Sequence, residues 1–239
     1  MAQTKFAKKV EDDIGCYFQE IGKSSVIFSN ELHLQMHLAQ YLQCKKGHRL
    51  HYEYRVPSKC IKDKKSYPWL NRYGNPQEMY FDLVVYDETE FVPIEIKYKP
   101  RSLGIDATIF NRVEKGVDIL RNQGAQDLGM YGFWKDVYRL ELVRDIYPTV
   151  KNGIALFVTN DPYYPQNDPE SSVNHYHFRM TDGRKVSKED FRWVNKNSKT
   201  AKKCPAFKVK GMYEIQWHPI DEHSLSGQRN EFHYCLITI

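Results

Sequence analysis

Apolar residues recur along this chain with two different periods, and each period predicts one type of secondary structure. Spacing by three or four residues predicts three helices, over 28–44, 105–122 and 130–147. Alternation, or an unbroken apolar run of strand length, predicts four strands, at 50–56, 79–87, 91–98 and 152–161. This order of elements is typical of an α/β fold in which helices flank a mixed sheet.

The pattern is weaker after residue 161. A short hairpin is expected around Asp182–Gly183, and late strands are expected at 212–220 and 232–239. We therefore expect two parts, a core of helices and strands over 1–161 and a β-rich basic extension over 162–239 that packs on the core. Inside the core, the segment 57–78 is a long loop, and loops of this length are often functional.

Basic residues are concentrated in two places, although the formal net charge is only +5. Residues 184–210 contain ten Lys or Arg against two acids, and residues 59–72 contain five against one. Clusters of this kind suit a nucleic-acid backbone. Lysines that only keep the surface soluble would give the same pattern, so charge alone leaves both interpretations open.

The cysteines and the hydropathy indicate the compartment. The five cysteines are odd in number and form no Cys-x-x-Cys pair, which predicts reduced thiols and a cytoplasmic protein. No apolar run approaches the roughly 20 residues that a membrane helix needs, so no membrane association is expected. His33 and His37 have metal-ligand spacing on the first helix, but no third ligand is visible in the sequence. The Cys/His group between 44 and 60 matches no zinc-finger spacing.

The predicted hairpin at 79–98 carries charged residues where apolar ones would pack more easily. Glu95 and Lys97 are two residues apart on the second strand, so their side chains share a face about 7 Å apart. Asp82 lies among strong strand formers on the first strand and can approach Glu95 across the hairpin. The alternative is a cross-strand ion-pair ladder on an exposed face.

Two carboxylates that are forced together need a proton or a cation between them. Hard oxygen ligands with open water positions are what Mg²⁺ prefers, and Mn²⁺ suits similar ligands. A bound ion would lower the pKa of a water and stabilise charge on a phosphoryl oxygen. Lys97 would orient that water or neutralise the charge that develops on the phosphate.

The pattern Asp-x12-Glu-x-Lys on a hairpin resembles the PD-(D/E)xK nuclease superfamily, which has the restriction-endonuclease-like fold. The predicted order of elements from about 28 to 159 is similar to that family's core, although Phe81 stands where many members have Pro. The resemblance implies that Asp82 and Glu95 bind the metal and that Lys97 is catalytic. It also implies that the Ile96 carbonyl completes the coordination.

Glu31 matches a further acid that many family members carry on the first helix. It shares a helical stripe with Leu34 and Leu38, which predicts that it faces the interior. By the resemblance, Glu31 is a further, water-mediated metal ligand with a role in catalysis. Compensation of the helix dipole explains an acid in the first turn equally well.

The resemblance therefore implies a Mg²⁺- or Mn²⁺-dependent phosphodiesterase, endonuclease or exonuclease, with DNA favoured as substrate. A homodimer is expected if both strands of a duplex are cut. The candidates for nucleic-acid binding are four lysines, an arginine and a base-stacking tryptophan: Lys59, Lys62, Lys64, Lys65, Arg101 and Trp69. The alternatives are a catalytically silent nucleic-acid-binding or scaffold protein with the same fold, and an interaction domain with no nucleic-acid role.

Overall fold

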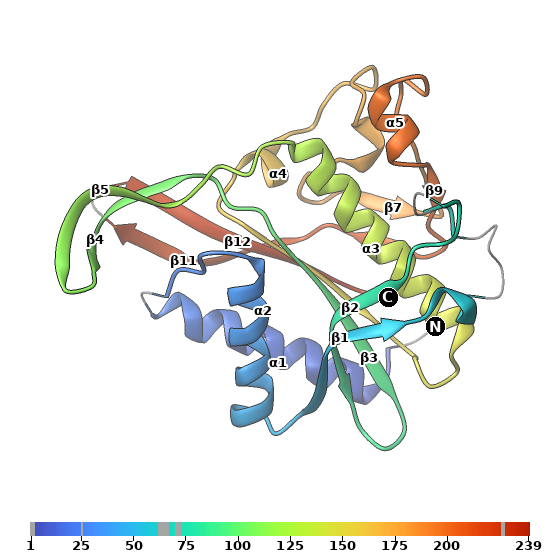
Figure 1. Cartoon of the computed structure of the whole chain (residues 1–239), viewed down its shortest axis with the longest axis horizontal. Coiled ribbons are helices and arrows are strands. Elements are labelled where there is room, and N and C mark those ends of the chain that lie inside the picture. The colour runs from blue at the N-terminus through green and yellow to red at the C-terminus, as the bar shows by residue number, and fades with distance from the viewer. Residues whose placement is uncertain (1–2, 25, 62–66, 70–72, 226–227) are drawn as a thin grey trace.

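A six-stranded mixed sheet forms the centre of the computed structural model (Figure 1), which describes residues 3–24, 26–61, 67–69, 73–225 and 228–239. The strand order is β1-β2-β3-β6-β12-β11. Its members are β1 (Arg49–Val56), β2 (Met79–Tyr86), β3 (Phe91–Tyr98), β6 (Ile154–Thr159), β11 (Trp217–Leu225) and β12 (Gln228–Thr238). β3 and β6 are parallel, and the other neighbouring pairs are antiparallel.

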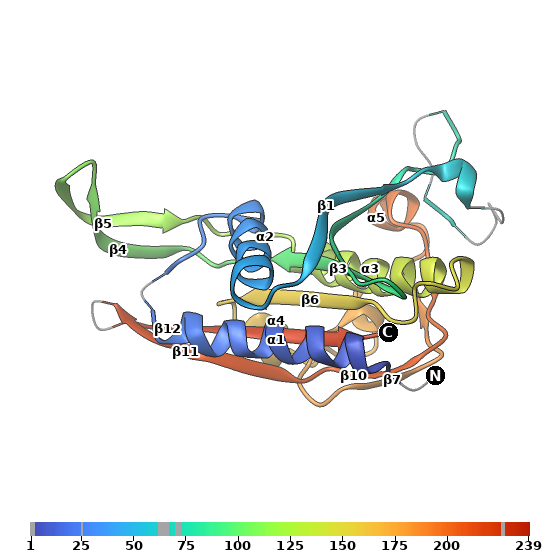
Figure 2. The same cartoon turned by 90° about the horizontal axis from the view of Figure 1, so that it is seen from below.

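Helices cover both faces of the sheet, which confirms the predicted mixed α/β architecture (Figure 2). Helices α1 (Lys5–Gly22) and α2 (Glu31–Gln40) pack against one face, and α2 continues into a π-helical turn, Tyr41–Lys45. Helix α3 (Gln126–Ile146) and much of the 163–215 segment pack against the other face. The sheet therefore separates two apolar cores.

The β2–β3 hairpin and β6 form where the sequence pattern predicts them. Val92, Ile94, Ile96 and Tyr98 point into the core beneath α1 and α2, while Glu95 and Lys97 point toward α3. All six residues of β6 are buried, as expected for a central strand that is covered on both faces. The N-cap of α2 is Asn30, whose side chain accepts a hydrogen bond from the His33 N–H at 2.8 Å.

The predicted helix at 105–122 is wrong, because this segment is a β-hairpin of β4 (Leu103–Ile109) and β5 (Arg112–Leu120). Its apolar residues are spaced by four, and that spacing also fits the two-residue period of a strand. Phe110 and Asn111 adopt positive φ angles of 47° and 66°, which close a tight turn. The hairpin projects from the body of the protein (Figures 1 and 2).

Small elements occupy the segment between β6 and β11. They are α4 (Tyr163–Gln166), the 3-10 turn Tyr176–Phe178, α5 (Lys199–Lys203), and the short strands β7 (Lys185–Ser187), β8 (Asp190–Phe191), β9 (Phe207–Lys208) and β10 (Met212–Glu214). A further 3-10 turn, Ser58–Cys60, lies between β1 and β2. The predicted hairpin around Asp182–Gly183 is wrong, because β7 pairs with β10 and β8 pairs with β9. Gly183 does form a turn, with φ of 74°.

The late strands are longer than expected and belong to the main sheet. β12 pairs with β6 along six residue pairs, from His233↔Thr159 to Thr238↔Ile154, and β11 forms the adjoining edge. The segment predicted as an extension therefore supplies two of the six central strands. Within the described residues, none of the helices has the length and apolar character needed to cross a membrane.

Candidate active site

The candidate site lies where β2 separates from β3. The backbones of β2 and β3 pair regularly as far as Leu83↔Ile94. Beyond that pair, the side chain of Asp82 replaces the backbone as the hydrogen-bond partner of β3. Its Oδ2 accepts a hydrogen bond from the Ile96 N–H at 2.6 Å. Phe81 and Leu83 are two positions apart, so strand alternation would place them on one face, yet they point into opposite cores. The β2 strand therefore twists locally at Asp82. This twist aims the Asp82 carboxyl at β3.

Helix α2 supplies two polar side chains to the same gap. The Gln35 amide donates to the Asp82 carbonyl at 2.8 Å and to Glu53 Oε1 at 2.9 Å. Glu31 Oε2 accepts a hydrogen bond from the Tyr98 N–H at 2.8 Å. Glu31 thus lies beside the end of β3, on the inward stripe that the sequence predicts. Backbone groups that the separated strands leave unpaired are satisfied by these side chains.

Glu95 is buried beneath α3 and faces an arginine from that helix. The side chain of Glu95 is only 3% exposed, and its Oε1 lies 2.8 Å from Arg139 Nη1. Arg139 also contacts Asp136 Oδ1 at 3.1 Å and donates to the Tyr80 carbonyl. One guanidinium therefore joins two buried carboxylates and the backbone of β2.

Lys97 points the same way as Glu95, as the strand alternation predicts. Its Nζ lies 3.0 Å from Asp136 Oδ2 and donates to the Ile96 carbonyl at 3.1 Å. The lysine stem lies along α3 at Gly132, where an added Cβ would be at an ordinary van der Waals distance of 3.7 Å from Lys97 Cε. The end of β3 is thus surrounded by Asp82, Glu95, Lys97 and Glu31. Helix α3 covers Glu95 and Lys97 on their face of the sheet.

Burial and mutual repulsion change the protonation of these groups. Burial raises the pKa of Asp82 to about 7, although Lys97 and the Ile96 N–H act in the opposite direction. Burial also raises the pKa of Glu95 well above its usual range, against the attraction of Arg139. Burial opposes the charge of Lys97, but Asp136 and Glu31 outweigh that effect, so the pKa of Lys97 is raised and the amine stays charged.

The carboxylates suit a hard cation chemically, although they are held apart by basic side chains. Glu95 Oε1 and Asp136 Oδ2 are buried and make no hydrogen bond within the described part of the chain, so each relies on an ion contact alone. No group of three or more His, Cys, Asp or Glu side chains in the described ranges stands ready to hold a metal ion. A divalent ion at Asp82, Glu95, Glu31 and the Ile96 carbonyl would therefore have to displace the guanidinium of Arg139 from Glu95.

The predicted nucleic-acid contacts lie in different settings. Lys59 and Arg101 are exposed, whereas Lys62, Lys64 and Lys65 fall outside the described residues. Trp69 is buried, donates its indole N–H to the Tyr131 hydroxyl at 2.7 Å and lies under the Lys135 ammonium. The indole is thus part of the core, and its packing does not support the prediction that it stacks on a base.

The 184–210 segment keeps most of its basic residues on the surface. Arg184 is the exception: it is buried, pairs with Glu189 at 2.8 Å and donates to backbone carbonyls, so it serves the fold. Seven others are exposed: Lys185, Lys188, Arg192, Lys196, Lys199, Lys202 and Lys203. Lys208 and Lys210 are exposed as well but contact Asp190 and Asp145.

Sequence reasoning missed the contribution of α3 to the site. Asp136 and Arg139 are three residues apart, a spacing that places both on one helix face. In the sequence, these two residues resemble an ordinary ion pair on an exposed helix face, because both polar and apolar residues surround them. Two buried-type neighbours, Trp134 and Val137, were the signal that this turn of the helix lies inside the protein.

Comparison with known proteins adds no relative to this description. No protein-family model, no curated protein and no solved structure matches the chain.

Proposed function

We propose that this protein is a metal-dependent nuclease of restriction-endonuclease-like fold, which hydrolyses phosphodiester bonds and favours DNA. The observation that carries the proposal is the convergence of Asp82, Glu95, Lys97 and Glu31 at one end of β3. Buried acids with raised pKa values beside a charged lysine are costly for a fold, and such groups concentrate at functional sites.

The roles follow from the positions of the side chains. Asp82, Glu95 and the Ile96 carbonyl would hold Mg²⁺ or Mn²⁺, with Glu31 beside them as a ligand through water. The ion, when bound, supplies a water of lowered pKa and stabilises charge on the phosphoryl group. Lys97 stays protonated and positions the attacking water or neutralises charge on the phosphate.

Arg139 and Asp136 are positioning residues in this proposal. Arg139 neutralises Glu95 while the site holds no cation, and Asp136 orients the Lys97 ammonium. Basic residues at the surface, including Lys59, Arg101 and the exposed residues of 184–210, would grip the phosphate backbone. Cutting both strands of a duplex would require two such sites and hence a homodimer.

A second candidate is a protein that binds nucleic acid, or serves as a scaffold, without cutting. The ion pairs Arg139–Glu95 and Lys97–Asp136 favour it, because they compensate most of the buried charge without any metal. In that case Asp82, Glu95, Glu31 and Asp136 stabilise the fold, and only the surface lysines and arginines are functional.

Cleavage assays separate the two candidates. Purified protein is incubated with plasmid, single-stranded DNA and RNA, with Mg²⁺, Mn²⁺ or EDTA. The nuclease proposal expects metal-dependent cleavage that falls at least about 100-fold in Asp82→Asn and Lys97→Met. Lys151→Ala is the control, because Lys151 is exposed before β6, at the opposite end of the sheet from the site.

The amide and methionine variants keep side-chain size, and the urea midpoint of each variant separates lost chemistry from lost folding. Salt-sensitive binding without cleavage under any condition would reject the nuclease and support the silent candidate. Neither binding nor cleavage would leave the interaction-domain alternative.

A further inference from the structure

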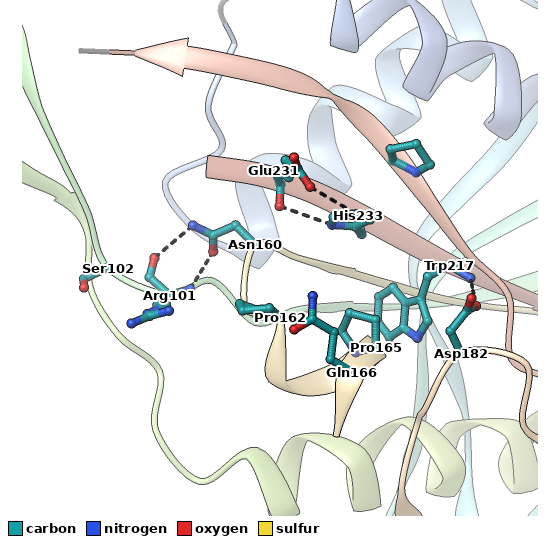
Figure 3. Close-up of a pocket in the computed structure, with 11 residues that line it drawn as sticks. Arg101, Ser102, Asn160, Pro162, Pro165, Gln166, Asp182, Trp217, Glu231 and His233 are labelled. Atoms are coloured by element: carbon teal, nitrogen blue, oxygen red, sulfur yellow. Dashed lines mark hydrogen bonds and ion pairs between the residues drawn. The ribbon is translucent and has the colours of Figure 1, made fainter. Parts of the chain in front are cut away.

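A polar groove opens beyond the carboxyl ends of β3 and β6 (Figure 3). Its volume of about 890 Å³ is within the range of small-molecule and nucleotide sites, roughly 300–1,000 Å³. The lining comes from the segments that follow β3 and β6, from α4, from the turn at Asp182, and from β11 and β12. Its polar and aromatic members include Arg101, Asn160, Gln166, Asp182, Trp217 and His233.

The groove opens on the same face of the sheet as Glu95 and Lys97. Cys235 and Ile237 on β12 belong to the core beneath α3, and His233 shares their face because side chains alternate along a strand. β3 and β6 run parallel, so their carboxyl ends meet at one edge. Ligands of open α/β sheets bind outside the carboxyl ends of the strands.

Arg101 is fixed at the mouth of the groove by its backbone. The Arg101 N–H donates to Asn160 Oδ1 at 2.6 Å, and the Asn160 amide donates back to the Arg101 carbonyl at 3.4 Å (Figure 3). Thr159 adds a hydrogen bond to the Lys99 carbonyl at 2.5 Å. These contacts fix the backbone at Arg101, which is four residues after Lys97. The Arg101 residue itself is exposed.

The rest of the groove combines a flat apolar surface with hydrogen-bonding side chains. The indole of Trp217 lines the groove, and its orientation is set by the bonds from its ring N–H to the Met180 carbonyl and from its backbone N–H to Asp182. Gln166 and His233 line it as well, and so does Glu231, whose Oε2 lies 3.9 Å from His233 Nε2. A ring on which a base can stack, beside groups that can bond a base edge, is the chemistry of nucleobase recognition.

We propose that this groove binds an unpaired nucleotide of the substrate strand, next to the phosphate that reaches the candidate site. Arg101 contacts the phosphate and Trp217 supports the base. A base whose edge faces Gln166 and His233 cannot be paired at the same time, so the substrate class is single-stranded nucleic acid or a frayed end. The inference rests on the proposed function for its substrate, but the groove is a separate set of residues.

Binding in EDTA tests the groove without any cleavage. Fluorescence anisotropy is measured with labelled oligo-dT, oligo-U and a blunt duplex of equal length. We expect tighter binding of the single strands than of the duplex. Arg101→Ala should weaken single-strand binding at least about fivefold, and Gln166→Ala should weaken it less. Trp217→Phe, which keeps an aromatic ring in the core, should retain most of the affinity.

Arg49→Ala is the charge-matched control. Arg49 is exposed at the start of β1, the end of the sheet opposite to Arg101. Equal weakening by Arg49→Ala and Arg101→Ala, equal affinity for duplex and single strand, or no binding of either would overturn the proposal. Groove-dependent binding without cleavage would keep the groove and reject the nuclease, whereas cleavage without it would do the reverse.

Discussion

At the scale of single residues, Arg139 balances buried negative charge in the candidate site. Its guanidinium contacts Glu95, Asp136 and the Tyr80 carbonyl. All three groups lie beside the gap between β2 and β3. The cost of burying this arginine is met only while its acidic partners are present. The site is therefore a coupled set of charges in which no member is independent.

Removing Arg139 alone should be strongly destabilising. Arg139→Ala leaves Glu95 and Asp136 buried without their cation, so the free energy of unfolding should fall by about 3 kcal/mol in urea titrations. The double variant Arg139→Met with Glu95→Gln should recover much of that loss. Arg55→Ala removes an arginine from the exposed pair with Glu78 and should cost less than about 1 kcal/mol. Equal losses in the two single variants would contradict this account.

The motif residues could be predicted from the sequence, and their partners could not. Strand alternation places Glu95 and Lys97 on one face, and the helical stripe places Glu31 inward, since both depend on local periodicity alone. Asp136 and Arg139 reach the site only because α3 crosses β3 in the fold, more than 35 positions later in the chain. No local period encodes that crossing.

At the scale of elements, the two errors in the helix predictions have separate causes. The hairpin of β4 and β5 was read as a helix because a spacing of four residues satisfies both periods. Helix α1 was not predicted, because its charged start hides the stripe of Val10, Ile14 and Phe18. Thr4 caps this helix by accepting from the Ala7 N–H, a signal that the sequence did contain.

The β4–β5 hairpin should divide into a structural base and an independent tip. Leu103 is buried at the base and Phe110 is fully exposed at the turn. Leu103→Ala should lower the free energy of unfolding by about 2–4 kcal/mol, because it leaves a cavity in the core beneath α1 and α2. Phe110→Ser should change it by less than about 0.5 kcal/mol. Urea unfolding of both variants checks this, and a large loss in Phe110→Ser would show that the tip packs on the body.

At the scale of the whole molecule, α1 joins distant parts of the chain. The Thr4 hydroxyl donates to Glu90 in the β2–β3 turn, and the Thr4 N–H donates to Asn152 before β6. Glu11 accepts from Thr238 at the end of β12. Asp13 lies 2.8 Å from the His48 ring just before β1 and 3.0 Å from Lys46. The helix and its N-cap therefore tie together four strands at one end of the sheet.

These contacts make stability depend on pH through Asp13. Burial would raise the pKa of Asp13, but its hydrogen bonds with His48 and Lys46 lower it below 3.8. A lowered pKa in the folded state stabilises the protein above the ordinary value and loses that stabilisation as pH falls through it. Asp13→Asn should therefore cost about 1 kcal/mol at pH 7 and less at about pH 3.

Urea midpoints at both pH values, beside the exposed neighbour Asp12→Asn, measure the difference. A constant loss at every pH would contradict the role of the Asp13 charge.

The separation of β2 from β3 has a consequence for how such a site persists in evolution. The Asp82 and Glu31 carboxylates each satisfy a main-chain N–H that the open strands leave without a partner. Selection for folding alone would then retain both acids in a lineage that had lost its chemistry. In descendants of this chain, the two acids would therefore indicate only that the sheet keeps this separation of strands. Activity has to be established by assay.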